Sequence, residues 1–216
     1  MATKFNYKLY LVTDQKACLY HDFLQVVKAA IKGGVDIVQI REKELPEKAF
    51  YTKALQLKEL LDKLGIPLIV NDSLPVAMQI NASGIHVGNS DLQPVAAKQL
   101  WPASRIIGYS LEDLAQLKSA DAATADYIAL SPVFSTPTKT NTIIEWGLAG
   151  IRQVRPLTKK PLVAIGNINS SNARAVVRAG ADCLAVISDI CSARDPERAA
   201  ANIRNEIEKA ASYDIL

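Results

Sequence analysis

The 216-residue sequence is poor in cysteine and has no excess of charge of either sign. Its three cysteines, Cys18, Cys183 and Cys191, form neither a Cys-x-x-Cys pair nor an even set, which argues against a disulfide framework and fits a reducing compartment. We interpret them as buried small hydrophobes rather than reactive thiols. The formal net charge is only +3, so no global field favours nucleic acid or a membrane surface as a partner. Any anion must be bound by a local site.

Long apolar runs and linkers are also missing. No apolar run approaches the roughly 18 residues of a membrane-spanning helix, and residues 1–7 lack the apolar core of a signal peptide. We therefore expect a soluble, unexported, cytoplasmic protein with no membrane partner. A chain that is 49% hydrophobic is excluded from the disordered class and can bury one full core, although its length also allows two small domains. Since no low-complexity stretch divides the chain, we predict a single domain over residues 1–216.

Short β-branched apolar runs alternate along the chain with segments of helical periodicity. This alternation predicts βα units with a parallel sheet. The eight expected strands cover residues 8–13, 37–40, 67–70, 84–87, 105–109, 127–130, 161–165 and 183–187.

The clearest expected helices cover residues 22–32, 46–63, 171–179 and 196–211, and two of them open with proline, which the first helical turn tolerates. Gly33, Gly65 and Gly180 stand where helices should end. Eight even units predict a (β/α)8 TIM barrel. A doubly wound sheet is the alternative, but no glycine-rich dinucleotide fingerprint follows the first strand. The one long loop, residues 132–145, indicates an active-site loop or lid.

Most of the unusual polar residues fall at or just after the carboxyl ends of these strands, where barrel enzymes place their reaction face. In chain order they are Gln39, Arg41, Lys43, Asn71, Asp72, Asp91, Ser110, Thr136, Thr138, Lys139 and Ser188, and Gly166 stands at the end of the seventh strand. Two carboxylates among basic residues suggest a site for Mg²⁺ and a diphosphate, because Mg²⁺ prefers a few carboxylates plus phosphate oxygens. Backbone N–H groups near Gly166 and Ser188 would form a second anion site. Together they indicate two phosphorylated substrates.

Each residue also has a plainer interpretation when taken alone. Asp72 or Asp91 can cap the next helix, Ser110 can cap a helix starting at Leu111, and Arg41 can pair with Glu42 or Glu44. His86, inside the fourth strand, is better explained as a structural histidine than as a ligand. No zinc pattern and no nucleophile with a partnered base is present, which argues against covalent catalysis.

These residues stand in motifs that resemble the thiamine phosphate synthase family over nearly the whole chain. The motifs are LYLVTD at residues 9–14, VQIREK at 38–43, VND at 70–72, GIHVGNSD at 84–91, IGYS at 107–110, SPVFSTPTKT at 131–140 and LAVISDI at 184–190. They follow the family in order and spacing.

The resemblance implies condensation of a pyrimidine methyl diphosphate with a thiazole phosphate, with release of pyrophosphate assisted by Mg²⁺. It implies that Gln39, Arg41, Lys43, Asn71, Ser110 and Lys139 hold the pyrimidine diphosphate, with Arg41, Lys43 and Lys139 also catalytic. Asp72 and Asp91 would bind the metal. The thiazole phosphate would contact Thr136, Thr138, Gly166, Asn167, Ile187 and Ser188.

At one position the chain departs from the family, which usually has a second glycine where Asn167 stands. Asparagine tolerates left-handed backbone better than most residues, so the phosphate-binding turn can survive. The rival from a related barrel is a thiazole tautomerase, whose proton-transfer histidine would fall at Pro132. A non-catalytic phosphate-binding barrel is a further alternative. We expect small-molecule substrates, no nucleic acid, and a homodimer as an open option.

Overall fold

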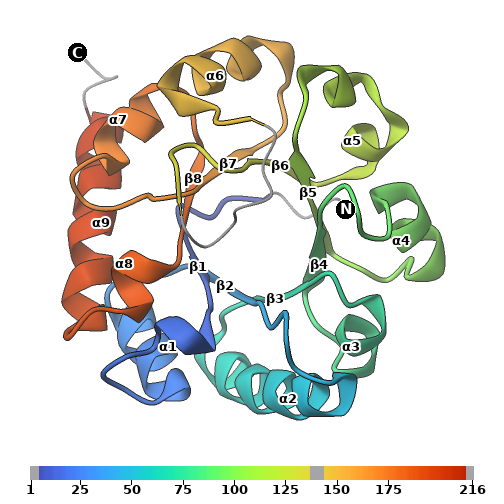
Figure 1. Ribbon diagram of the computed structural model, residues 1–216, viewed down its shortest axis with the longest axis vertical. Helices are drawn as coiled ribbons and strands as arrows, with labels where there is room; N and C mark the ends of the chain where they lie inside the picture. The colour runs from blue at the N-terminus through green and yellow to red at the C-terminus, as the bar shows by residue number, and fades with distance from the viewer. Residues whose placement is uncertain (1–4, 137–143, 213–216) are drawn as a thin grey trace.

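A closed barrel of eight parallel strands forms the centre of the molecule (Figure 1). The computed structural model describes residues 5–136 and 144–212. The strands are β1 (Leu9–Val12), β2 (Ile37–Ile40), β3 (Leu68–Asn71), β4 (Gly84–Val87), β5 (Ile106–Leu111), β6 (Tyr127–Leu130), β7 (Leu162–Ile165) and β8 (Cys183–Val186). Because β1 pairs with both β2 and β8, the sheet has no open edge. The predicted (β/α)8 barrel is confirmed, and the doubly wound sheet is excluded.

Helices surround the barrel as an outer ring (Figure 1). They are α1 (Phe23–Lys32), α2 (Glu47–Leu64), α3 (Leu74–Gln79), α4 (Pro94–Leu100), α5 (Ala120–Thr124), α6 (Gly147–Val154), α7 (Ala173–Arg178), α8 (Ser188–Cys191) and α9 (Pro196–Ala211). There are also three short 3₁₀ turns: η1 (Gln15–Ala17) precedes α1, η2 (Leu114–Lys118) precedes α5, and η3 (Arg155–Leu157) follows α6.

Three predicted helix starts need correction. Asp22 and Pro46 are the N-caps of α1 and α2 rather than their first residues. Helix α7 begins at Ala173, not at residue 171, because the Asn169 side chain accepts hydrogen bonds from the backbone N–H and hydroxyl of Ser171 and holds a turn there. Gly65 ends α2 in the left-handed conformation, with φ +68°, as its position predicted.

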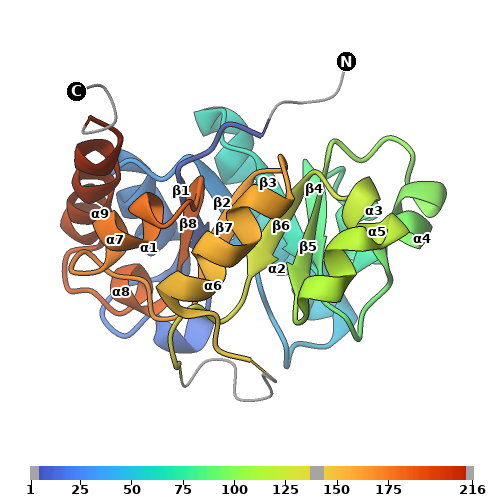
Figure 2. The ribbon, with the colours of Figure 1, turned by 90° about the horizontal axis from the view of Figure 1, so that it is seen from above.

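Side chains alternate along each strand between the barrel interior and the ring of helices. In β1, Leu9 and Leu11 pack in the outer core cluster, whereas Tyr10 and Val12 belong to the inner one. The inner cluster also contains Phe5, whose ring centroid lies 4.7 Å from that of Tyr127. The N-terminal segment and the loop after β6 lie at opposite ends of the barrel (Figure 2). Phe5 therefore packs at the end away from the loops that follow the strands.

The cysteine prediction is only partly met. Cys183 and Cys191 are buried, but Cys18 is half-exposed, and all three are free thiols. In the part of the chain that the structure describes, no helix is both long and apolar enough to cross a membrane.

Candidate active site

A cavity of about 470 Å³ opens at the carboxyl ends of the strands. It gathers every described residue that the sequence proposed for the site. These are Gln39, Arg41, Lys43, Asn71, Asp72, Asp91, Ser110, Thr136, Gly166, Asn167, Ile187 and Ser188. Thr138 and Lys139 lie outside the described residues. Residues from across the chain thus meet in one place.

One wall of the cavity carries the carboxylates of Asp72 and Asp91, with Lys43 beside them. We call the two carboxylates and this lysine the acidic wall. Asp72 adopts left-handed backbone with φ +62°, and its N–H donates to the His86 carbonyl at 2.9 Å, which fixes the turn after β3. Lys43 forms an ion pair with the Asp72 carboxylate. Asp91 accepts a hydrogen bond from the Gly88 N–H at 2.8 Å. Burial raises the pKa of the Asp91 carboxyl, and the Asp72 carboxylate raises that pKa further, because a second negative charge disfavours ionisation.

The capping roles considered for the aspartates are wrong. The N-cap of α3 is Ser73, whose hydroxyl accepts from the Val76 N–H, and the N-cap of α4 is Gln93. Ser110 caps no helix either, because β5 continues to Leu111. These polar side chains are therefore free of the structural tasks that capping would give them.

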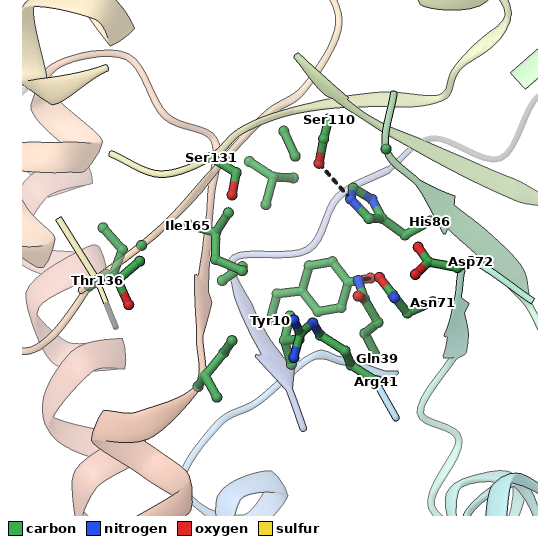
Figure 3. A pocket seen from close by; sticks show the side chains of 18 of the residues that line it. Tyr10, Gln39, Arg41, Asn71, Asp72, His86, Ser110, Ser131, Thr136 and Ile165 are labelled. Atoms are coloured by element: carbon green, nitrogen blue, oxygen red, sulfur yellow. Dashed lines mark hydrogen bonds between the residues drawn. The ribbon is translucent and has the colours of Figure 1, made fainter. Parts of the chain in front are cut away.

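The ion pairs considered for Arg41 are also wrong. Glu42 pairs with Lys53, and Glu44 pairs with Lys16 at 2.6 Å. The Arg41 side chain instead lines the cavity (Figure 3), where a guanidinium suits a bidentate anion.

The donor set of the acidic wall fits Mg²⁺. Within residues 5–136 and 144–212, no three His, Cys, Asp or Glu side chains come together as a metal cage. Mg²⁺ is usually held by one or two carboxylates, waters and substrate phosphates, so Asp72 and Asp91 suffice on the protein side.

The turn after β7 contains part of the second predicted anion site. Gly166 has φ +112° and Asn167 has φ +51°, so the turn after β7 is left-handed at both residues. The Asn172 side chain donates to the Asn167 carbonyl at 2.8 Å and holds this turn. A Cβ on Gly166 would lie 2.6 Å from the Pro132 Cβ, so only glycine fits. The departure at Asn167 therefore leaves the left-handed turn in place.

A hydrogen-bonded row of side chains lies between β2 and β5 and was missed by the sequence interpretation. It consists of Gln39, Tyr10, Tyr127, His86 and Ser110, in that order. Figure 3 shows the His86–Ser110 bond at the cavity wall. Tyr10 and Tyr127 stand within apolar strand runs, so the sequence offered no signal for a polar role. His86 has partners at both ring nitrogens, as a structural histidine should.

A closed barrel with a polar cavity at the carboxyl ends of its strands defines the class of (β/α)8-barrel enzymes. The family model described as thiamine monophosphate synthase matches residues 9–190. The chain belongs to that family.

Relatives of the chain carry the same description over nearly their whole length. A thiamine-phosphate synthase from Albidiferax ferrireducens is 48% identical over 201 residues, which cover 93% of this chain and 92% of that protein. One from Leptospira biflexa is 44% identical and covers 92% of this chain and 96% of its own. The solved thiamine phosphate pyrophosphorylase from Pyrococcus furiosus superimposes with a TM-score of 0.86 at 32% identity, covering 96% and 98% of the two chains.

Proposed function

We propose that this transferase joins a pyrimidine methyl diphosphate to a thiazole phosphate, forming thiamine phosphate and pyrophosphate. The observation that supports this most directly is a single cavity with two different ends. One end has two carboxylates beside Arg41 and Lys43, and the other has the left-handed turn at Gly166 and Asn167 beside Ser188. Such a cavity suits two phosphorylated substrates held in one space.

In the proposed reaction the bond between the pyrimidine methylene carbon and its diphosphate oxygen breaks first, and the pyrophosphate leaves with the electron pair. The resulting cation is stabilised by the amino group of its own ring. The thiazole nitrogen then attacks the methylene carbon with its lone pair. No proton transfer is needed to form the new bond, so the reaction requires neither a protein nucleophile nor a general base.

The chain contributes charge and orientation. Arg41 and Lys43 would stabilise the negative charge that grows on the leaving pyrophosphate. Bound Mg²⁺, held by Asp72 and Asp91, would neutralise further charge on the same phosphates. Thr136, Ile187 and Ser188 line the cavity, where they would fix the thiazole phosphate so that its nitrogen faces the cation. Thr138 and Lys139 join these roles on resemblance alone.

The tautomerase alternative lacks its proton carrier. At the position of the expected histidine stands Pro132, which has no group that can accept or release a proton. The carboxylates of Asp72 and Asp91 would also have no part in that reaction.

The decisive experiment is incubation of the purified chain with both phosphorylated substrates and Mg²⁺, followed by detection of thiamine phosphate by mass spectrometry. Product should form with Mg²⁺ and disappear when a chelator is added. A thermal melt should show stabilisation by pyrophosphate only when Mg²⁺ is present, because binding to the folded state raises its stability. A well-folded protein that forms no product would refute the proposal.

A further inference from the structure

The hydrogen-bonded row described above spans five strands, and all five of its residues line the cavity, with Gln39 and Ser110 at its ends. The Gln39 amide Nε2 donates to the Tyr10 hydroxyl at 2.9 Å, and the Tyr10 and Tyr127 hydroxyls lie 3.1 Å apart. The Tyr127 hydroxyl lies 2.8 Å from His86 Nδ1, and His86 Nε2 lies 2.9 Å from Ser110 Oγ. We call these five side chains the relay.

The donor and acceptor roles along the relay depend on one another. Because Tyr10 accepts from Gln39, its own hydrogen points to Tyr127, and the Tyr127 hydrogen then points to His86 Nδ1. The His86 hydrogen must therefore sit on Nε2 and point to Ser110 Oγ. Burial raises the pKa of both tyrosines well above the ordinary value, so neither hydroxyl loses its hydrogen at neutral pH.

The relay consequently fixes the orientation of both end groups. One amide hydrogen of Gln39 is bound by Tyr10, which holds the amide against a flip and keeps its oxygen as an acceptor at a fixed place. One lone pair of the Ser110 oxygen accepts from His86, so the hydroxyl hydrogen points away from His86 and is a donor. If the roles were reversed at one end, every bond between would have to reverse as well.

The absence of a side chain at Gly108 leaves the space that Tyr127 and His86 occupy. A Cβ on Gly108 would lie 2.1 Å from Tyr127 Cζ and 2.5 Å from His86 Nδ1, so any larger residue would push the two rings apart. Tyr127 and Tyr10 are 0% and 1% exposed, and buried hydrogen bonds of this kind are costly to leave unmade.

We propose that Tyr10, Tyr127 and His86 are positioning residues that make the cavity selective for an aminopyrimidine. An exocyclic amino group donates to the Gln39 oxygen, and a ring nitrogen accepts from the Ser110 hydroxyl. A 4-oxo pyrimidine would instead set its exocyclic oxygen, which is an acceptor, against the fixed Gln39 oxygen, which is an acceptor too. The inference rests on the proposed function, since Gln39 and Ser110 must face the pyrimidine substrate.

The first test reads the His86 tautomer directly. The chain has only two histidines, so ¹⁵N NMR of the His21→Gln variant reports His86 alone. The hydrogen should sit on Nε2 in the wild-type relay. A hydrogen on Nδ1 would overturn the inference, whatever the enzyme catalyses.

The second test measures selectivity in Tyr127→Phe and Tyr10→Phe, which remove only a hydroxyl. The quantity is the inhibition constant of the 4-oxo diphosphate analogue divided by KM of the amino substrate. Each variant breaks two bonds of the relay. The misplaced end group should then lose one hydrogen bond to the substrate, which should lower this ratio about 2- to 13-fold, chiefly by raising KM. Ile69→Val is the matched control, because Ile69 is 0% exposed in the same inner cluster and does not line the cavity.

The outcomes of these tests separate the positioning role of the relay from the proposed function. A fall in the ratio for either tyrosine variant, with the ratio of Ile69→Val unchanged, supports the inference. Tyrosine variants that lose stability as Ile69→Val does and keep the wild-type ratio would show a structural role only and overturn it. If instead the wild type forms no thiamine phosphate, the proposed function fails and the selectivity fails with it.

Discussion

Replacing Gly108 by alanine should destabilise the barrel although alanine is the better strand residue. Glycine inside a strand normally costs about 0.5–1 kcal/mol relative to alanine, so the intrinsic preference favours the substitution. The added Cβ would lie 2.1 Å from Tyr127 Cζ and 2.2 Å from its hydroxyl oxygen, and β5 has no freedom to move within a closed sheet. The steric contact therefore decides the sign of the change in stability.

The magnitude follows from two effects. Overpacking a buried site costs about 1–3 kcal/mol, and losing the Tyr127–His86 hydrogen bond costs about 0.5–1.5 kcal/mol more. After the gain in strand preference, the net loss is roughly 0.5–4 kcal/mol. For a domain of this size it should lower the Tm by roughly 1–16 °C.

Thermal melts of the wild type, Gly108→Ala, Tyr127→Phe and the double variant measure this. The two single losses should not add, because each breaks the same Tyr127–His86 bond. A Gly108→Ala protein that melts at or above the wild-type temperature and keeps the wild-type KM would show that the ring positions tolerate a side chain and that the reasoning is wrong.

Three further predictions concern the cavity. Asp72→Asn and Asp91→Asn should fold normally but lose turnover and the Mg²⁺-dependent stabilisation by pyrophosphate. The control Asp62→Asn, on α2, should keep both properties. Near wild-type activity of either cavity variant at saturating Mg²⁺ would show that its carboxylate does not bind the metal. Asn167→Gly should change KM for the thiazole phosphate by up to about 13-fold, the worth of one hydrogen bond, and leave KM for the pyrimidine diphosphate unchanged; a change confined to the latter would mean that the two anion sites are exchanged. Lys139→Ala should turn over more slowly and release more hydroxymethyl pyrimidine, because the cation would be captured by water; unchanged rate and partition would exclude Lys139 from the mechanism.

Much of the fold could be predicted because barrel strands and helices have local signals. The β-branched runs located all eight strands to within two residues at each end, and Gly65 marked the end of α2. Helix starts were less certain, since the turn at Asn169 that delays α7 depends on side-chain bonds rather than on periodicity.

The candidate site, too, could be predicted from the sequence only in part. Polar residues at strand ends, such as Arg41 and Asp72, stand out in the sequence because nothing in a strand pattern requires them there. Their plainer roles could be rejected only from the structure, which gives the α3 cap to Ser73 and the Glu42 ion pair to Lys53. Capping and pairing depend on three-dimensional neighbours, and the residue type alone does not choose among them.

By itself the sequence determined the order of the βα units, the polar residues at their ends and the family, because each is written in contiguous residues. Tertiary structure alone decided that Tyr10 and Tyr127 meet, since β1 and β6 are far apart in sequence and face each other only across the closed barrel. It also explained why residue 108 is a glycine, because the space that a Cβ would take is filled by a side chain from another strand. A pattern within one strand shows which side chains point inward, and only closure of the sheet shows what they touch there.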